Sequence, residues 1–177
     1  LYDNEVYGLT KGQAGPTLGL GEKPKSLPRP NPQGKVNPLL LAFASGYTWI
    51  ARGYAYDVKG LKELIKEGIA HRGLAFLHVL QPCPTYNDLH TKEWFAPRLY
   101  RLEEEGYDPL VPPGLPPEAL EARMARFQQK ALEWGERIPV GVFWKAELPT
   151  FEARLKAYLP RYPEAYPARG PETPLDL

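Results

Sequence analysis

The chain has 177 residues, of which 43% are hydrophobic and 24% charged, an ordinary mixture for one globular domain with its own core. A net charge of +1 gives no electrostatic case for binding nucleic acid, and no apolar run approaches the roughly 20 residues of a membrane-spanning helix. The single cysteine excludes an internal disulfide and fits a reducing compartment, so we expect a cytoplasmic protein. The 21 prolines and 16 glycines cluster in a few segments, which predicts long ordered loops and is compatible with a heat-adapted source.

Residues 3–17 (DNEVYGLTKGQAGPT) are predicted to form a loop and no regular element, because three glycines and a proline punctuate them. The segment offers oxygen ligands from Asp3 and Asn4, two threonine hydroxyls and the cation of Lys11. Oxygen donors beside a lysine suit a magnesium–diphosphate pair, because magnesium takes few protein oxygens and completes its octahedron with phosphate and water. A solvated glycine-rich turn is the alternative interpretation of the same composition.

Residues 13–37 contain many prolines and glycines with basic residues between them, and they are expected to form an extended surface arm. Two roles for this arm remain open. It is either a flexible loop or a segment that lies against a neighbouring subunit.

A βαβ unit is predicted next. A short helix is expected to begin at Asn37 and Pro38 and to end at Gly46, and residues 47–51 are predicted to form a buried strand. A second helix over about 58–71, capped by Asp57, and an apolar strand over 74–80 follow. Strand, helix and strand in this order indicate a parallel sheet with a right-handed crossover. The apolar face expected for the second helix consists of Leu61, Leu64, Ile65 and Ile69.

The second half of the chain is predicted to continue the α/β pattern. Residues 91–105 are expected to form an aromatic-rich helix, and a longer helix is expected from 117 to about 134. Residues 138–144 read as a strand in which Pro139 demands either an edge position or a place near the strand's start. A last short helix begins at 150, and an extended proline-rich tail covers 160–177.

Two residues at the second predicted strand carry chemistry. His78 lies inside the strand and is expected to be a hydrogen-bonded core histidine. Cys83, between Pro82 and Pro84, follows the strand's carboxyl end, which is the edge where open α/β sheets bind ligands. A lone semi-buried cysteine is the alternative, because a metal site built only from this chain would need more soft ligands than one.

Four segments together resemble one family. Residues 3–13 (DNEVYGLTKGQ) resemble the signature of the β subunit of 2-oxoacid:ferredoxin oxidoreductases, which depend on thiamine diphosphate. Residues 81–87 (QPCPTYN) are similar to the family's Ser-Pro-Cys-Pro-Thr-Tyr/Phe-Asn segment, with Gln81 in place of the usual serine. Residues 47–53 (YTWIARG) and 137–144 (RIPVGVFW) resemble two further family segments. The resemblance covers about residues 1–155 and is weakest over 13–37.

The resemblance implies roles for the residues of the first loop. The Asn4 side-chain oxygen and the Val6 backbone carbonyl would bind magnesium, and Lys11 would be a catalytic residue where substrate or coenzyme A approaches. Lys59 would approach the substrate side, although a solvated helix lysine is an equally good interpretation. The residues implied to line the cofactor are Gly8, Leu9 and Thr10.

The resemblance also implies an iron–sulfur cluster. Where family members have a cluster in this subunit, the cysteine equivalent to Cys83 is a ligand of a 4Fe–4S cluster, and the other three ligands come from an N-terminal stretch that this sequence lacks. The first half of the family's cofactor motif, Gly-Asp-Gly, is likewise absent, so we expect a fragment of a longer subunit.

The resemblance leads to one expectation for the whole chain. The fold would be the three-layer α/β thiamine diphosphate-binding fold, a mostly parallel sheet flanked by helices, with its N-terminal part missing; residues 1–159 would form this domain. The chain would belong to an enzyme that oxidatively decarboxylates a 2-oxoacid to an acyl-coenzyme A, and would be inactive alone. Its partners would be an α subunit and ferredoxin in an oligomer. The alternative is a non-catalytic α/β docking or assembly module.

Overall fold

The computed structural model describes residues 1–159 and 161, and the chain divides into two units, Leu1–Glu147 and Leu148–Leu177. Except for residue 161, the predicted tail lies outside the described residues. None of the described helices is long and apolar enough to cross a membrane. The second unit contains one described helix, α5 (Phe151–Tyr158), which begins where the Thr150 hydroxyl accepts a hydrogen bond from the Ala153 N–H at 3.2 Å. The predicted last helix is therefore confirmed.

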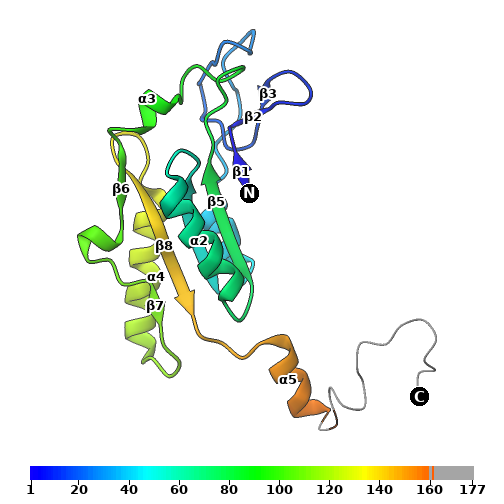
Figure 1. Cartoon of the computed structure of the whole chain (residues 1–177), viewed down its shortest axis with the longest axis vertical. Coiled ribbons are helices and arrows are strands. Elements are labelled where there is room, and N and C mark those ends of the chain that lie inside the picture. The colour runs from blue at the N-terminus through cyan, green and yellow to red at the C-terminus, as the bar shows by residue number, and fades with distance from the viewer. Residues whose placement is uncertain (160, 162–177) are drawn as a thin grey trace, which may run out of the picture. The chain divides into compact units, whose positions relative to one another are not determined.

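The first unit contains the predicted βαβ unit (Figure 1). Strand β4 (Trp49–Tyr54) leads into helix α2 (Val58–Ala70), which leads into strand β5 (Ala75–Leu80). The two strands are parallel and paired along their whole length, from Trp49 opposite Ala75 to Tyr54 opposite Leu80. The predicted parallel crossover is confirmed, and the carboxyl ends of both strands meet at one edge of the sheet.

The sheet is mostly parallel, as expected. Its order is β1-β5-β4-β8-β6, with β7 also paired to β8. The pairings β1–β5, β4–β5, β6–β8 and β7–β8 are parallel, and only β4–β8 among the pairings of this sheet in the described part of the chain is antiparallel. The added strands are β1 (Tyr2–Asp3), β6 (Leu99–Arg101), β7 (Leu110–Val111) and β8 (Ile138–Ala146).

Helices cover both faces of the sheet and make three layers (Figure 1). On one face, Trp49 of β4 reaches α2, where its indole N–H donates to Glu67 at 3.3 Å. Ile50, the next residue, points to the opposite face, because successive side chains of a strand alternate. There it belongs to a buried cluster with Leu39 of α1 (Pro38–Ala44) and Phe127 of α4 (Pro117–Leu132).

The helices begin where the sequence predicts. The Asn37 side-chain oxygen accepts hydrogen bonds from the N–H groups of Leu39 and Leu40 at 3.0 and 3.2 Å, so it caps α1. The Asp57 carboxylate accepts from the Gly60 N–H at 3.0 Å and caps α2. Such caps satisfy backbone donors that a first helical turn otherwise leaves without partners.

The single helix predicted for 91–105 is wrong. A short helix α3 (Lys92–Phe95), strand β6 and a 3₁₀ turn η1 (Glu103–Glu105) occupy that range. The physical reason is non-local, because β6 pairs with the start of β8 and places Leu102, 1% exposed, in the core. Tertiary contacts of this kind override helix propensity.

Pro139 takes the second of its two predicted places. It is the second residue of β8, and it lies within the sheet, opposite Tyr100 of β6. A proline lacks an N–H to donate to a neighbouring strand. Pairing with β4 involves Gly141 and later residues of β8, so the missing donor does not interrupt it.

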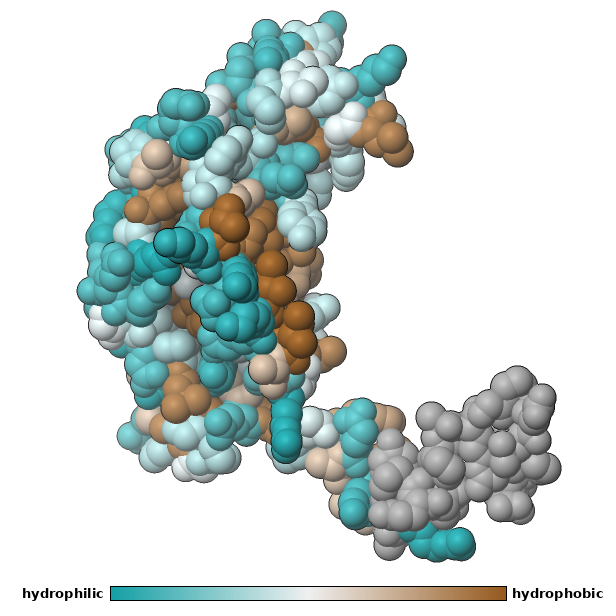
Figure 2. Space-filling view, viewed as in Figure 1, coloured by the Kyte–Doolittle hydropathy of each residue, from teal (hydrophilic) through white to brown (hydrophobic). Residues whose placement is uncertain are grey.

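Half of the apolar face predicted for α2 is not covered by the described residues. Leu61 and Leu64 pack over Gly53 of β4, where an added Cβ would lie 2.9 and 3.3 Å from their methyl groups. Ile65 and Ile69 are instead 39% and 81% exposed. Figure 2 shows apolar residues gathered beside α2 on this face of the molecule.

Candidate functional site

The N-terminal segment begins at the carboxyl edge of the parallel strands. Asp3 of β1 lies opposite Leu80, the last residue of β5, and its carbonyl accepts a hydrogen bond from the Gln81 N–H at 2.9 Å. The residues that follow are therefore held where open α/β sheets bind their ligands. The backbone at this edge positions Asn4 before the segment leaves the sheet.

The prediction that residues 3–17 contain no regular element is wrong. Strands β2 (Val6–Tyr7) and β3 (Gln13–Ala14) form an antiparallel hairpin. The Gly12 N–H donates to the Tyr7 carbonyl at 2.8 Å, and the left-handed backbone of Lys11 and Gly12, with φ of 76° and 104°, turns the tip. In the sequence, the glycine that this turn needs indicates only a loop, because the two strands are too short to show a periodicity.

The hairpin leaves one backbone carbonyl directed away from its partner strand. The carbonyls of Glu5 and Tyr7 accept hydrogen bonds from the N–H groups of Gly15 and Gly12, which flank the second strand, each at 2.8 Å. Successive carbonyls of a strand point to opposite sides, so the carbonyl of Val6 points away from β3. The Asn4 side-chain oxygen accepts a 3.2 Å hydrogen bond from the N–H of the same residue, Val6. The base of the hairpin therefore offers two hard oxygen donors, from residues two positions apart in the chain.

Glu5, between these two residues, is the centre of a buried polar network. Its side chain is 5% exposed, and its backbone is left-handed with φ of 65°. The carboxylate accepts from the Asn87 amide at 3.1 Å and from the Lys35 ammonium at 3.2 Å, and it contacts the His90 ring. Two segments distant in sequence, one with Lys35 and one with Asn87 and His90, are thus tied to the residue that separates the two candidate magnesium ligands.

The same network brings together potential metal ligands. Oxygen and nitrogen atoms of Glu5, Glu22 and His90 lie within 4.8 Å of one another. The Lys35 ammonium and the Asn87 amide already contact the Glu5 carboxylate, however, and they supply the positive charge and hydrogen bonds that a buried carboxylate needs. We therefore interpret the cluster as the support of the hairpin.

The tip of the hairpin is exposed. Leu9 is 99% exposed, and Gly8, Thr10 and Lys11 are exposed as well. The Thr10 hydroxyl donates to Gln13 at 2.5 Å, which stiffens the tip. The structure thus separates the predicted residues into a buried base and a solvent-facing tip.

Residues 13–37 lie against their own chain, which differs from the extended arm that we expected. Leu18 is fully buried and Asn31 is 3% exposed, with the Asn31 amide donating to the Leu18 carbonyl at 2.9 Å. The Lys25 ammonium donates to the Pro84 carbonyl at 3.0 Å. These hydrogen bonds hold the segment against the rest of the chain, and a composition rich in prolines and glycines does not reveal them.

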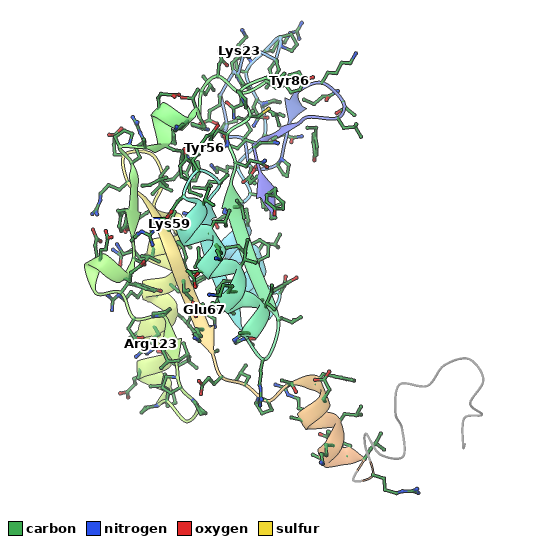
Figure 3. All side chains as sticks on the ribbon, viewed as in Figure 1. Lys23, Tyr56, Lys59, Glu67, Tyr86 and Arg123 are labelled. Carbon is green, nitrogen blue, oxygen red and sulfur yellow. The ribbon has the colours of Figure 1, made fainter. Side chains whose placement is uncertain are left out.

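The loop that carries Cys83 packs beside the hairpin. The Asn87 N–H donates to the Cys83 carbonyl at 2.9 Å, and the Asn87 amide reaches both Glu5 and the Asn4 carbonyl. Tyr86, labelled in Figure 3, lies at the end of the molecule that carries the hairpin. Cys83 is a partly buried free thiol, and the metal-ligand cluster found among the described residues does not include it.

His78 is a hydrogen-bonded core histidine, as predicted. It is 2% exposed and lies between Arg52, whose Nε donates to His78 Nδ1 at 3.3 Å, and Asp3, 2.8 Å from His78 Nε2. Burial lowers the pKa of His78 to about 4, against the opposing effect of Asp3. Burial by itself would raise the pKa of Asp3, but hydrogen bonds from His78 and Thr17 bring it below its ordinary value. A neutral imidazole therefore supports the first residue of the hairpin segment.

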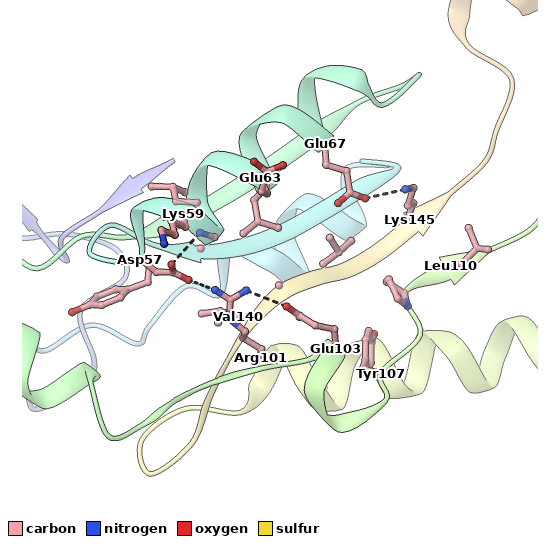
Figure 4. Close-up of a pocket in the computed structure, with 18 residues that line it drawn as sticks. Asp57, Lys59, Glu63, Glu67, Arg101, Glu103, Tyr107, Leu110, Val140 and Lys145 are labelled. Atoms are coloured by element: carbon pink, nitrogen blue, oxygen red, sulfur yellow. Dashed lines mark hydrogen bonds and ion pairs between the residues drawn. The ribbon is translucent and has the colours of Figure 1, made fainter.

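Lys59 lies apart from the hairpin. It is exposed on the first turn of α2, and it lines a cavity of about 630 Å³ between α2 and the segment around β6 (Figures 3 and 4). Arg101 pairs there with Asp57 and Glu103, and Lys145 pairs with Glu67 at 2.9 Å. The hairpin residues do not line this cavity.

The sequence did not indicate the residues that hold the hairpin in place. Glu5 lies within the first motif and Asn87 within the second, but the sequence assigns neither a role, and His90 lies outside both motifs. A buried carboxylate with three partners is recognisable only once distant segments are brought together. The sequence offers one weak signal, since Asn87 ends the Cys83 segment and His90 follows three residues later.

Comparison with protein-family models accounts for most of the chain. Residues 1–79 match the model described as "Thiamine pyrophosphate enzyme, C-terminal TPP binding domain". Residues 83–159 match the model of the C-terminal part of the pyruvate ferredoxin oxidoreductase beta subunit. Together with the three-layer fold, these matches define a thiamine diphosphate-binding α/β domain.

Curated relatives lead to the family. The chain is 58% identical over 171 residues to the 2-oxoacid:ferredoxin oxidoreductase subunit beta of a Sulfolobus species, covering 96% of this chain and 55% of the relative. It is 49% identical over 170 residues to subunit beta of 2-oxoacid:ferredoxin oxidoreductase 2 from Aeropyrum pernix, covering 95% and 54%. The chain belongs to the β subunits of 2-oxoacid:ferredoxin oxidoreductases and spans about half the length of these relatives.

A solved structure supports the same assignment. The chain matches the 2-oxoglutarate:ferredoxin oxidoreductase from Magnetococcus marinus, which was solved with 2-oxoglutarate, coenzyme A and succinyl-CoA bound. The TM-score is 0.71 at 30% identity, over 91% of this chain and 51% of that one. The expected fold class is therefore confirmed.

Proposed function

We propose that this chain forms the cofactor-facing part of an enzyme that oxidatively decarboxylates a 2-oxoacid to an acyl-coenzyme A. Electrons would pass through an iron–sulfur cluster to ferredoxin, and an α subunit would complete the active site. Thiamine diphosphate, when bound, supplies the thiazolium that stabilises the carbanion left by decarboxylation. The chain alone would be inactive, because its hairpin tip faces solvent in the described residues.

The observation that carries the proposal is the pair of oxygens at the base of the hairpin. The Asn4 side-chain oxygen and the outward Val6 carbonyl lie at the carboxyl end of β5, and both are hard ligands of the kind magnesium prefers. Two protein oxygens fit a magnesium ion whose other ligands are diphosphate and water. The fit supports Asn4 and Val6 as the residues of this chain that would hold the ion.

Because the hairpin tip is exposed, its residues could contact a ligand that another subunit holds in part. Gly8, Leu9 and Thr10 would line the diphosphate and thiazolium end of the cofactor. Lys11 would act as the catalytic lysine that orients the anionic substrate or coenzyme A. Lys59 would serve the substrate side from α2, near the same carboxyl edge of the sheet.

Cys83 would provide one ligand to a 4Fe–4S cluster. The chain has no other cysteine, so it cannot by itself supply the four thiolates that such a cluster commonly uses. The position of Cys83 supports the role, because the Cys83 loop and the hairpin share the Asn87 contact. The remaining ligands would come from outside this chain.

Calorimetry of thiamine diphosphate with magnesium, on the assembled enzyme, tests the metal assignment. Asn4→Ala is expected to weaken binding at least tenfold, because it removes a direct ligand of the ion. Gln129→Ala, which removes an exposed amide from α4, is the matched control and should bind as the wild type does. Equal affinity in Asn4→Ala and wild type contradicts the role of Asn4.

The alternative of a docking module makes a different prediction for Lys11. If the chain only docks partner subunits, Lys11→Ala leaves turnover of the assembled enzyme unchanged. The enzyme proposal instead expects a large loss of turnover with cofactor binding preserved. Steady-state rates with several 2-oxoacids, together with the calorimetry above, separate the two functions.

A further inference from the structure

A second, smaller cavity lies on the face of the sheet that α1 and α4 cover. It has a volume of about 200 Å³, and its polar lining comes from Lys35, Asn37, Arg52 and His78, with Trp134 as an aromatic wall. Arg52 belongs to β4 and His78 to β5, whereas Lys35 and Asn37 precede α1. The lining contains two cationic side chains and no carboxylate.

Arg52 is a buried cation whose hydrogen bonds leave part of the guanidinium unused. The side chain is 2% exposed. Its Nε donates to His78 and its Nη1 to the Pro139 carbonyl at 3.4 Å, and neither acceptor is charged. Among the described residues, Nη2 has no hydrogen-bond partner and no carboxylate lies within ion-pair distance of Arg52. The guanidinium carbon does lie 5.3 and 5.7 Å from the ring centroids of Phe143 and Trp134, which compensates its charge in part. Burying a charge in this way is costly unless a partner compensates it.

The carboxylate of Asp3 is separated from Arg52 by the neutral ring of His78. Asp3 contacts Nε2 of His78, on the far side of the imidazole from Arg52. The ring is neutral at physiological pH because burial lowers its pKa to about 4, so it accepts from Arg52 and donates to Asp3. Asp3 therefore stabilises the Nε side of the guanidinium and leaves Nη2 without a hydrogen-bond acceptor.

Lys35 adds a second positive charge to the cavity wall. Its ammonium lies 3.2 Å from Glu5 and 3.3 Å from the centroid of the Trp134 ring. Glu5 also serves Asn87 and His90, so its single charge is shared among several donors. Burial lowers the pKa of Lys35, although the carboxylates of Glu5, Glu22 and Asp3 act in the opposite direction.

We propose that this cavity binds a small inorganic anion of the size of chloride, held between the free Nη2 group of Arg52 and the ammonium of Lys35. The volume admits such an ion with a few waters, since one water occupies about 30 Å³ of the liquid. It is smaller than the roughly 300–1,000 Å³ of pockets that take organic ligands, which disfavours a substrate or nucleotide. This site is separate from the hairpin tip and does not depend on the proposed reaction.

The first experiment measures thermal unfolding of the full chain while chloride replaces gluconate at constant ionic strength. Gluconate is a bulky, well-hydrated anion that does not mimic a compact halide, and constant ionic strength holds general screening fixed. The unfolding midpoint of the wild type is expected to rise by a few degrees over about a hundredfold range of chloride, because an ion that binds only the folded state stabilises it. A midpoint that does not respond to chloride overturns the proposal.

Matched variants assign the response to the cavity. Arg52→Met should abolish the rise with chloride, whereas Arg29→Met, at an exposed arginine, should retain it. A response that persists in a folded Arg52→Met variant contradicts the assignment.

Crystals of the wild type soaked in bromide give a readout that needs no variant. Anomalous density between Arg52 and Lys35 is expected. Its absence, or the presence of an acidic side chain from another segment in the cavity, overturns the proposal.

Discussion

At the scale of single residues, Glu5 decides where the candidate magnesium ligands lie. It lies between Asn4 and Val6 in a left-handed backbone conformation that residues other than glycine rarely adopt. Its buried carboxylate contacts Lys35, Asn87 and His90. The cost of the backbone conformation is offset by these contacts, so the ligand geometry depends on a residue that touches neither metal nor cofactor in our proposal.

Glu5→Gln is therefore expected to destabilise the full chain by about 3 kcal/mol. The substitution preserves shape but removes the charge that compensates Lys35, and breaking a buried ion pair on one side costs roughly 3–5 kcal/mol. Glu63→Gln is the control, because Glu63 pairs with Lys66 on the surface at 2.8 Å, and exposed pairs contribute little. Denaturant titration measures both variants. Equal stability of the two would contradict the supporting role of Glu5.

The motif and its support differ in how far sequence can predict them. Asn4 belongs to a contiguous stretch whose residue types suggest oxygen ligation, and the resemblance of that stretch to the family signature implies the role of Val6, so the stretch is recognisable before any fold is known. Glu5, Asn87 and His90 act through contacts between segments more than 80 residues apart. No periodicity or spacing encodes such contacts, and the support of the site was therefore missed.

At the scale of elements, strand β8 joins two kinds of pairing. Residues 138–140 pair in parallel with β6, and the antiparallel pairing with β4 involves residues from Gly141 onward. Gly141 has φ of 119°, and an added Cβ would lie 2.9 Å from a carboxylate oxygen of Glu103. The change of partner thus depends on a backbone conformation that only glycine adopts readily.

Gly141→Ala is expected to destabilise the chain by about 1–3 kcal/mol, because it forces an L side chain into a sparsely populated backbone region. Gly34→Ala is the matched control, since an added Cβ at Gly34 meets nothing within 4 Å and its φ is not positive. Thermal unfolding of both variants measures the difference. A Gly141→Ala variant as stable as Gly34→Ala would show that β8 changes partner without this conformation.

The elements themselves were predictable where local signals were long and consistent. Helix α2 and strands β4 and β5 follow from a capped amphipathic segment between two apolar runs. Residues 91–105 were misjudged because β6 is three residues long and exists only through its pairing with β8. The hairpin β2–β3 could not be predicted for a similar reason, since strands of two residues show no detectable periodicity.

At the scale of the whole molecule, the residues to which our proposal gives roles lie in two separate places. The hairpin, the Cys83 loop and the support around Glu5 lie together, whereas Lys59 lines a different cavity along α2 (Figure 3). The residues that would hold cofactor and cluster share the carboxyl edge of the sheet. An electron leaving the cofactor would therefore have a short path to a cluster ligated by Cys83, provided that the other ligands come from outside the chain.

Cys83→Ser in the assembled enzyme is expected to lower the iron content and to abolish ferredoxin reduction, because one of four thiolates is lost. Binding of thiamine diphosphate should persist, since the contact of Cys83 with Asn87 runs through the Cys83 backbone carbonyl and does not involve the thiol. Gln81→Ser, which restores the serine usual in the family, is the control and should leave the iron content unchanged. Iron and sulfide analysis with electron paramagnetic resonance measures the cluster. A full complement of iron in Cys83→Ser would mean that the cluster, wherever it lies, does not use this chain, and the thiol would then be only a partly buried side chain.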